Sequence, residues 1–189
     1  MKLKRLLTAA LSAVMALSVC ALPAMAAGTT STSTFDPSIT KGTLTISKYE
    51  QTEEDKTKTD ANGKKGKLLD GVEFTVYKLA DIKQVDGKLV YAPVAALNRV
   101  LSDDDFNDAT AEGSIDSEKL YKTISQKLSK AKFDMNGLSP ESKTTGKDSS
   151  VGAGKVKFEL DLGIYMVAET KAPSQILTKS ANFIVSIPM

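Results

Sequence analysis

A lysine falls on the apolar face of the first strand that the sequence predicts. Residues 43–50, Thr-Leu-Thr-Ile-Ser-Lys-Tyr-Glu, alternate so that Lys48 shares a face with Leu44 and Ile46. If these two apolar side chains point into a core, the lysine points there as well. The alternative is a lysine at the strand end that extends its ammonium group to water.

A glutamate near the other end of the chain also falls on the apolar face of a predicted strand. Residues 162–173 read as a buried strand followed by a loop with a proline, and Glu169 shares a face with Tyr165 and Val167. A carboxylate on a core face is costly unless it is paired, hydrogen-bonded or protonated. We therefore regard Lys48 as a candidate partner of this glutamate.

The composition removes most catalytic chemistry. The chain has no histidine, and its one cysteine is Cys20. Ser-His-Asp and Cys-His catalysis are therefore excluded, and a zinc site would have no imidazole ligand. Cleavage of an N-terminal signal that contains Cys20 would remove the thiolate ligand as well. We expect no metal and no cofactor. The remaining enzyme hypothesis is a secreted hydrolase that depends on carboxylates.

The N-terminus has the pattern of an export signal. Three basic residues within the first five positions precede a mostly apolar run over residues 6–22, and Ala24-Met25-Ala26 fits an A-x-A cleavage site. We predict a signal peptide over residues 1–26; a retained membrane helix is the alternative. Val19 replaces the small residue that a lipobox needs before Cys20, which argues against lipidation.

Cleavage of this signal leaves a nearly neutral chain. Subtracting its three basic residues from 25 Lys and Arg leaves 22, against 23 Asp and Glu, which is a net charge of −1. This balance lacks the basic excess of a nucleic-acid-binding surface, so we expect no nucleic-acid partner. The exported chain would also have no disulfide to stabilise it.

The rest of the chain reads as one domain. We predict a flexible leader over residues 27–41 and a folded domain over 42–189, with a helical insertion at about 93–132. The predicted strands are residues 43–50, 72–79, 155–161, 162–170 and 182–187, with a hairpin at Asp86-Gly87 between short apolar pieces at 80–85 and 89–92. The predicted helices are residues 94–101 and 116–131. Residues 51–67 and 139–154 are predicted loops.

This order of strands, helical insertion and strands predicts a mainly β protein, an antiparallel sandwich. The acidic stretch at residues 102–108 raises a calcium hypothesis, with Asp103, Asp104, Asp105 and Asp108 as ligands. The stretch lacks the spacing and the glycine of an EF-hand loop, so a helix cap and a solvated turn are the preferred interpretation.

Three strand motifs together resemble a known family. They are Gly-Thr-Leu-Thr-Ile-Ser-Lys-Tyr at 42–49, Gly-Val-Glu-Phe-Thr-Val-Tyr-Lys-Leu at 71–79, and Tyr-Met-Val-Ala-Glu-Thr-Lys-Ala-Pro at 165–173. With the signal peptide, they resemble the N-terminal (D1-type) domain of backbone pilins, the fimbrial subunits of sortase-assembled pili of Gram-positive bacteria. The third motif looks like the E-box of that family. The resemblance covers nearly all of the mature chain.

The resemblance implies an immunoglobulin-like fold of the collagen-adhesin-B type. In this family a lysine on the first strand often forms an isopeptide bond with an asparagine on the last, and the E-box glutamate promotes the reaction. By this match Lys48 is the nucleophile and Glu169 the catalyst. The alternatives are a noncovalent core pair and two charges at strand ends. Isopeptide formation would be self-modification and not enzymatic turnover.

The chain departs from the family pattern near its end. The family's pilin motif, of the form Tyr-Pro-Lys-Asn with an upstream Trp, does not occur in these residues, and neither does a Leu-Pro-x-Thr-Gly sorting signal. Asn182 is the remaining candidate acceptor. It shares a strand face with Ile184, whereas Phe183, Val185 and Ile187 form the more apolar face, so an exposed edge position is the alternative. We expect the front part of a longer subunit, with a sandwich that lacks its last strand and leaves the first strand with an open edge.

The expected function is therefore structural. The resemblance implies a subunit of a pilus on the cell wall, covalently polymerised by a pilus-specific sortase and supporting adhesion. Its expected partners are other pilin subunits, the sortase, and a host surface or co-aggregating bacteria. A cell-wall adhesin module of the same fold is the alternative within this fold group, and the secreted hydrolase is the second alternative.

Overall fold

We describe the protein from a computed structural model. The structure describes residues 14–17, 38–50, 66–85, 88–107, 116–174, 176 and 179–187. Within these parts of the chain, none of the helices is both long enough and apolar enough to cross a membrane.

The first sheet is built around β2 (Lys41–Glu50). Strand β7 (Lys155–Asp161) pairs with it antiparallel, from Lys41 opposite Asp161 to Ser47 opposite Lys155. The short β3 (Lys67–Leu68) pairs with the last two residues of β2. The alternating sequence predicted both long strands, because each needs one apolar face and one polar face.

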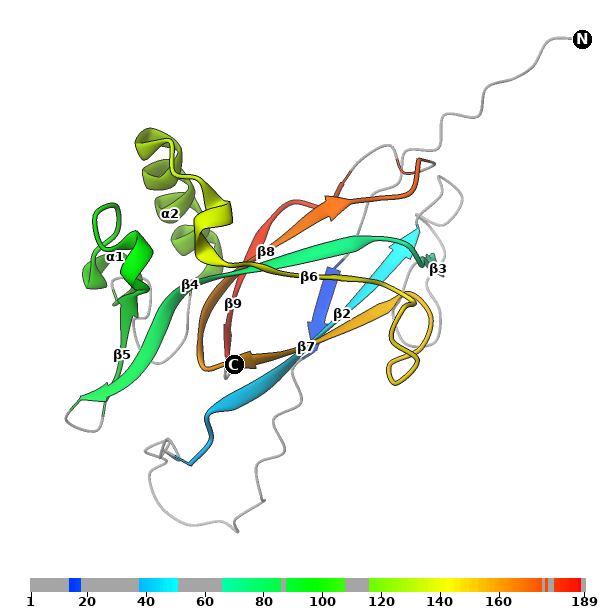
Figure 1. The fold of residues 1–189 in the computed structure, drawn as a ribbon, viewed down its shortest axis with the longest axis horizontal. Helices are drawn as coiled ribbons and strands as arrows, with labels where there is room; N and C mark the ends of the chain where they lie inside the picture. Colours follow the sequence, from blue (N-terminus) through cyan, green and yellow to red (C-terminus); the bar gives the residue numbers. More distant parts are fainter. Residues whose placement is uncertain are drawn as a thin grey trace, which may run out of the picture.

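Strand β1 (Val14–Leu17) also pairs with β2, antiparallel along residues 45–48. Figure 1 shows it beside β2. These four residues belong to the segment that we expect to be cleaved as an export signal. In the expected mature chain, this edge of β2 is thus available to another strand.

The second sheet has the order β5-β4-β8-β9, with β6 on the β5 side of β4. The long β4 (Glu73–Val85) pairs with β8 (Gly163–Lys171) on its other edge, and β8 in turn pairs with β9 (Phe183–Ile187). All of these pairs are antiparallel. The structure therefore confirms the predicted class, a mainly β protein with packed antiparallel sheets.

Strand β4 is longer than predicted because a bulge joins two predicted pieces. The prediction ended one strand at Leu79 and began another apolar piece at Ala80. In the structure the strand continues, with an irregularity in its pairing with β8 between Lys78 and Ala80. The bulge changes which residues share a face, so both Leu79 and Ala80 face the helices. Residues Val85 and Lys88 then pair, as expected for a hairpin at Asp86-Gly87.

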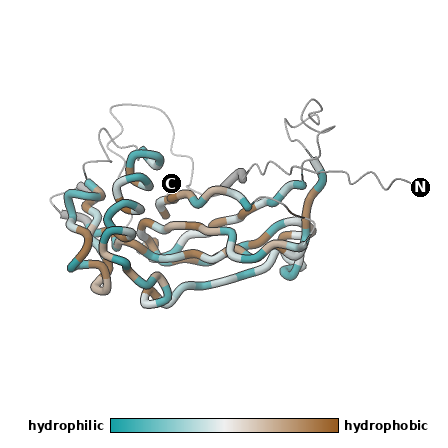
Figure 2. The backbone as a smooth tube through the Cα atoms, turned by 90° about the horizontal axis from the view of Figure 1, so that it is seen from above, coloured by the Kyte–Doolittle hydropathy of each residue, from teal (hydrophilic) through white to brown (hydrophobic). Residues whose placement is uncertain are grey.

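Two cores lie on opposite faces of the second sheet. One fills the space between the sheets and includes Leu44, Phe74, Phe158 and Val167. The other lies between the second sheet and the helices and includes Leu79, Leu97, Phe106, Leu120, Ile124, Leu128, Ile164, Met166 and Ile184. Hydrophobic and hydrophilic positions alternate along the strands in Figure 2, as this layering requires. The molecule is thus a sandwich with a third, helical layer at one end (Figure 1).

The main helix is α2 (Ser117–Ala131), as predicted. Asp116 caps it by accepting a hydrogen bond from the backbone N–H of Lys119 at 3.0 Å. Its single apolar stripe, Leu120, Ile124 and Leu128, is buried in the second core.

The predicted helix over 94–101 was wrong in extent. Only one 3-10 turn, η2 (Ala95–Leu97), forms there, and Pro93 is the last residue of β5 (Lys88–Pro93) and not part of a helical turn. A separate short helix, α1 (Asp103–Asn107), occupies the acidic stretch, and buried Phe106 anchors it to the core. A second 3-10 turn, η4 (Met135–Leu138), follows α2.

Part of the predicted loop 139–154 is instead the strand β6 (Glu141–Thr144), which pairs with residues 73–76 of β4. Its sequence, Glu-Ser-Lys-Thr, has no apolar face, so periodicity could not reveal it. Such a strand can form at a sheet edge, where polar side chains remain in water.

The helical layer should contribute to stability through its apolar stripe. We predict that Ile124→Ala lowers the free energy of unfolding by about 2–5 kcal/mol, because the truncation leaves a cavity under α2. Urea unfolding followed by circular dichroism measures this change. The exposed Lys122→Ala on the same helix is the control and should change stability by less than about 0.5 kcal/mol. Equal effects of the two substitutions would contradict this packing.

Candidate functional site

Lys48 is fully buried at the end of β2. Its backbone N–H donates to the carbonyl of Gly154 at 2.8 Å, and its own carbonyl accepts from the N–H of Leu69 at 3.0 Å. The side chain follows Leu44 and Ile46 into the core between the sheets and is 0 % exposed. The hypothesis that this lysine extends to water is therefore wrong.

Gly154 makes this arrangement possible. Its φ is +64°, in the region that favours glycine, and a Cβ built on it would lie 2.6 Å from Cβ of Leu68. The tight approach lets the chain before β7 bond to the backbone of Lys48. Both the N–H and the carbonyl of Lys48 are thus hydrogen-bonded to neighbouring backbone.

Glu169 reaches the same place from the second sheet. It lies on β8, opposite Phe74 of β4, and follows Tyr165 and Val167 on the face that lines the core. Its side chain, like that of Lys48, is 0 % exposed. Strand β8 is buried on both faces from Gly163 to Val167, and Glu169 continues its core-facing row.

The two charged side chains meet directly. Nζ of Lys48 donates to Oε2 of Glu169 at 2.7 Å, within a buried ion pair. The structure therefore brings together the two site residues that the sequence singled out. Two opposite charges without contact to water gain from their attraction and lose their hydration.

Ser180 is the third member of the cluster. Its hydroxyl oxygen accepts from Nζ of Lys48 at 2.8 Å, and its backbone N–H donates to Oε2 of Glu169 at 2.9 Å. Sequence reasoning missed it because a serine in a polar loop before β9 has no periodicity to mark it. Only the path of the chain back to the end of β8 places it here.

The other carboxylate oxygen has a different environment. Oε1 of Glu169 is buried and, among the described residues, has no hydrogen-bond partner. A buried oxygen without a partner is unfavourable, and a neutral carboxyl or an incoming N–H group would relieve this. The cluster thus contains an amine, a carboxyl group and one unsatisfied oxygen inside an apolar core.

This geometry permits proton transfer without water. Transfer of one proton from Nζ to the carboxyl group that it contacts at 2.7 Å converts the ammonium–carboxylate pair into a neutral amine and a carboxylic acid. An apolar core favours uncharged groups over charged ones. A neutral amine is a nucleophile, and a neighbouring carboxyl group can pass protons to and from a reacting group.

Asn182 lies away from this chemistry. The residue immediately precedes β9 and is exposed, and no hydrogen bond joins it to Lys48 in the part of the chain that the structure describes. Among the described residues between β8 and β9, Ser180 hydrogen-bonds the lysine.

The acidic stretch forms no metal site in the described chain. No group of three or more potential ligands gathers among the residues 102–107, and Asp108 lies outside the described residues. The carboxylate of Asp105 instead pairs with Lys127 of α2 at 2.6 Å and accepts from the N–H of Ser102. Partial burial opposes ionisation of Asp105, but these hydrogen bonds outweigh it and lower its pKa.

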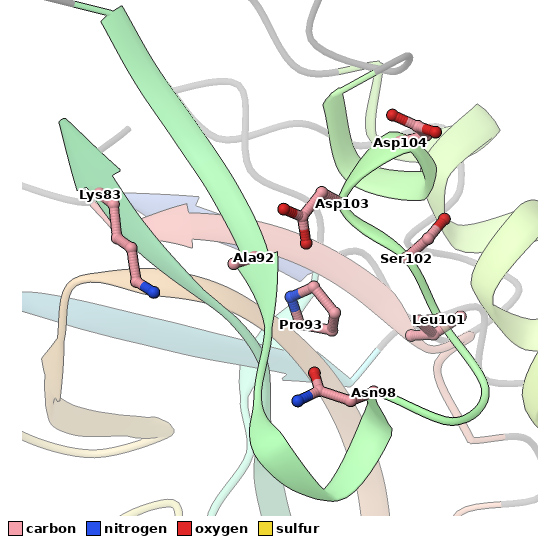
Figure 3. A pocket seen from close by; sticks show the side chains of 8 residues that line it. All are labelled: Lys83, Ala92, Pro93, Asn98, Leu101, Ser102, Asp103 and Asp104. Atoms are coloured by element: carbon pink, nitrogen blue, oxygen red, sulfur yellow. The ribbon is translucent and has the colours of Figure 1, made fainter. Parts of the chain in front are cut away.

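An open hollow of about 570 Å³ lies between β5 and α1 (Figure 3). It is lined by Lys83, Ala92, Pro93, Asn98, Leu101, Ser102, Asp103 and Asp104. Its two carboxylates belong to successive exposed residues of one helical turn, and Figure 3 shows that of Asp104 directed away from Asp103. Carboxylate-dependent hydrolysis of glycosides needs two carboxyl groups that flank one bond. This hollow gives the hydrolase hypothesis no support.

A family model matches most of the chain and agrees with the observed fold. The fold is a β-sandwich domain whose two sheets are joined internally by a buried lysine and glutamate. The family model of the Gram-positive pilin subunit D1, N-terminal domain, matches residues 39–189, and the chain belongs to this family. A search of curated proteins finds no match to the chain. The family identifies the chain as a structural subunit of a cell-surface pilus, which associates with other pilin subunits.

The buried pair should show strong energetic coupling. We predict that Lys48→Met and Glu169→Leu are each less stable than the double variant by about 3 kcal/mol, because each single change leaves one charge buried without its partner. Each variant lacks the amine, the carboxyl group or both, so none can form an isopeptide bond at Lys48 with the help of Glu169. Urea unfolding of the three proteins measures the coupling. A double variant less stable than both single variants would contradict it.

Proposed function

We propose that this chain is the N-terminal domain, over residues 42–189, of a pilus shaft subunit that a sortase polymerises covalently. The family membership supports the structural role. The expected signal peptide over residues 1–26 would export the subunit, and the assembled fibre would support adhesion to a host surface or to other bacteria. The buried contact between Lys48 and Glu169 is the observation that carries the more specific part of the proposal.

That specific part is an intramolecular isopeptide bond at Lys48. The neutral amine attacks the carboxamide carbon of an asparagine side chain, a new C–N bond forms, and the C–NH₂ bond breaks. Glu169 takes a proton from the attacking nitrogen and delivers one to the leaving group, which departs as ammonia. No oxidant or cofactor is needed.

The unsatisfied Oε1 of Glu169 supports this role. A carboxamide that enters the cluster can donate an N–H to this oxygen, or accept a proton from it, which polarises the carbonyl. Because Asn182 is exposed, we favour an asparagine on a further strand as the acceptor. The edge of β2 where β1 lies passes Lys48, and a strand there would approach the amine.

The bond would stabilise the domain covalently, as a disulfide does in other exported proteins. Residues 27–189 contain no cysteine to form one. A link between the first strand and a distant strand restrains the unfolded chain as a disulfide does. Subunits in a fibre transmit tension along the chain, so a covalent link within the domain would prevent its extension. A noncovalent Lys48–Glu169 pair remains the alternative for the site.

Intact mass spectrometry tests the bond. The subunit expressed from the whole of its reading frame should be lighter by one ammonia, ~17 Da, for each isopeptide bond. Lys48→Arg and Glu169→Ala should each abolish the loss assigned to this domain. Glu159→Ala removes an exposed carboxylate on β7 and should leave the mass loss unchanged. A folded wild-type subunit whose mass loss is the same with and without Lys48 would disprove the covalent proposal.

Polymerisation has its own test. Boiling cell-wall extracts in detergent should leave a ladder of high-mass species that an antibody to this domain detects, because sortase links are covalent. Deletion of the sortase should reduce the ladder to single subunits. A single band from wild-type cells would instead favour the adhesin module of the same fold.

A further inference from the structure

The segment between β8 and β9 brings Ser180 into the buried cluster. Ser180 lies 11 residues after Glu169 and is half-buried, and it contacts both members of the pair. Its hydroxyl oxygen is 2.8 Å from Nζ of Lys48, and its backbone nitrogen is 2.9 Å from Oε2 of Glu169. One residue thus provides an acceptor for the amine and a donor for the carboxyl group.

The hydroxyl determines how the amine is oriented. A neutral lysine amine has two N–H bonds and one lone pair in a tetrahedral arrangement. Oε2 of Glu169 and Oγ of Ser180 both lie within hydrogen-bond distance of Nζ and can each accept one of the two N–H bonds. The lone pair is then fixed along the remaining direction. Restricting rotation in this way favours attack, because the reacting orbital is already aligned.

The backbone N–H determines which carboxyl oxygen carries the proton. Oε2 is within hydrogen-bond distance of both Lys48 and the N–H of Ser180, whereas Oε1 has no partner among the described residues. Two donors on Oε2 favour negative or carbonyl character there. The proton of a neutral Glu169 therefore resides on Oε1, where it can be passed to an incoming carboxamide.

We propose that Ser180 is a positioning residue for isopeptide formation, which orients the amine of Lys48 and directs the proton of Glu169 to Oε1. The proposal rests on the isopeptide reaction proposed above. The reaction itself is unchanged: the amine nitrogen replaces the amide nitrogen on the carboxamide carbon, and ammonia leaves. Ser180 exchanges no atom with the reactants.

The two contacts can be separated by substitution. Ser180→Ala removes the hydroxyl and keeps the backbone N–H, while Ser180→Thr keeps both. Ser142→Ala is the matched control, because it removes a hydroxyl that hydrogen-bonds Thr75 at 2.8 Å on another strand pair. Thermal unfolding of the variants identifies any general loss of structure.

The test follows the reaction in time. The whole mature subunit is made by cell-free synthesis, samples are stopped in denaturant, and intact mass gives the fraction that has lost ammonia. Loss of one hydrogen bond to the reacting amine should slow Ser180→Ala by about 10-fold. Ser180→Thr and Ser142→Ala should react at the wild-type rate.

The outcomes distinguish the two proposals. Ser180→Ala that reacts as fast as wild type, or Ser180→Thr that is slowed as much as Ser180→Ala, overturns the positioning role and leaves the isopeptide reaction standing. A wild-type subunit that never loses ammonia at Lys48 overturns the reaction and the role together. A slow Ser180→Ala with rescue by threonine and unchanged unfolding temperature supports the role.

Discussion

The site of this domain depends on a lysine and a glutamate that face each other across 2.7 Å, with neither side chain exposed. Each charge would be strongly unfavourable in the core without the other. The contact requires that β2 of one sheet and β8 of the other keep their registers, since a shift by one residue would turn either side chain to the opposite face. The pair therefore links the two sheets and depends on both of them.

The strands and helices around the pair keep it buried and hold both strands in register. Strand β8 has the sandwich core on one face and the helical layer on the other. The helical layer therefore buries Ile164 and Met166, while Tyr165, Val167 and Glu169 face the core between the sheets. Backbone hydrogen bonds to Gly154 and Leu69 hold Lys48 in place. Ser180 completes the cluster from the segment that leads into β9. An interior built in this way keeps water from the amine and the carboxyl group, which is the condition that their proton transfer needs.

Much of this could be predicted from the sequence, and the limits have physical causes. The two-residue period placed Lys48 and Glu169 on core faces. Apolar and polar residues alternate in β2, whereas β8 is apolar on both faces, and there the period only relates Glu169 to Tyr165 and Val167. The same period failed for β6, whose polar residues form a sheet edge, and at the bulge of β4, where the alternation changes phase. Ser180 could not be found in this way. Its role depends on how a loop returns to the core, and local sequence does not encode that path.

We propose that Lys48 forms a covalent bond within the pilin subunit. Tandem mass spectrometry of protease-digested subunits, isolated from the cell wall, tests this bond most directly. The expected result is a branched peptide in which the side chain of Lys48 is joined to an asparagine-derived carbonyl of the same subunit, with no unmodified Lys48 peptide in the folded fraction. A linear peptide with an unmodified Lys48 as the main species in folded subunits would contradict it.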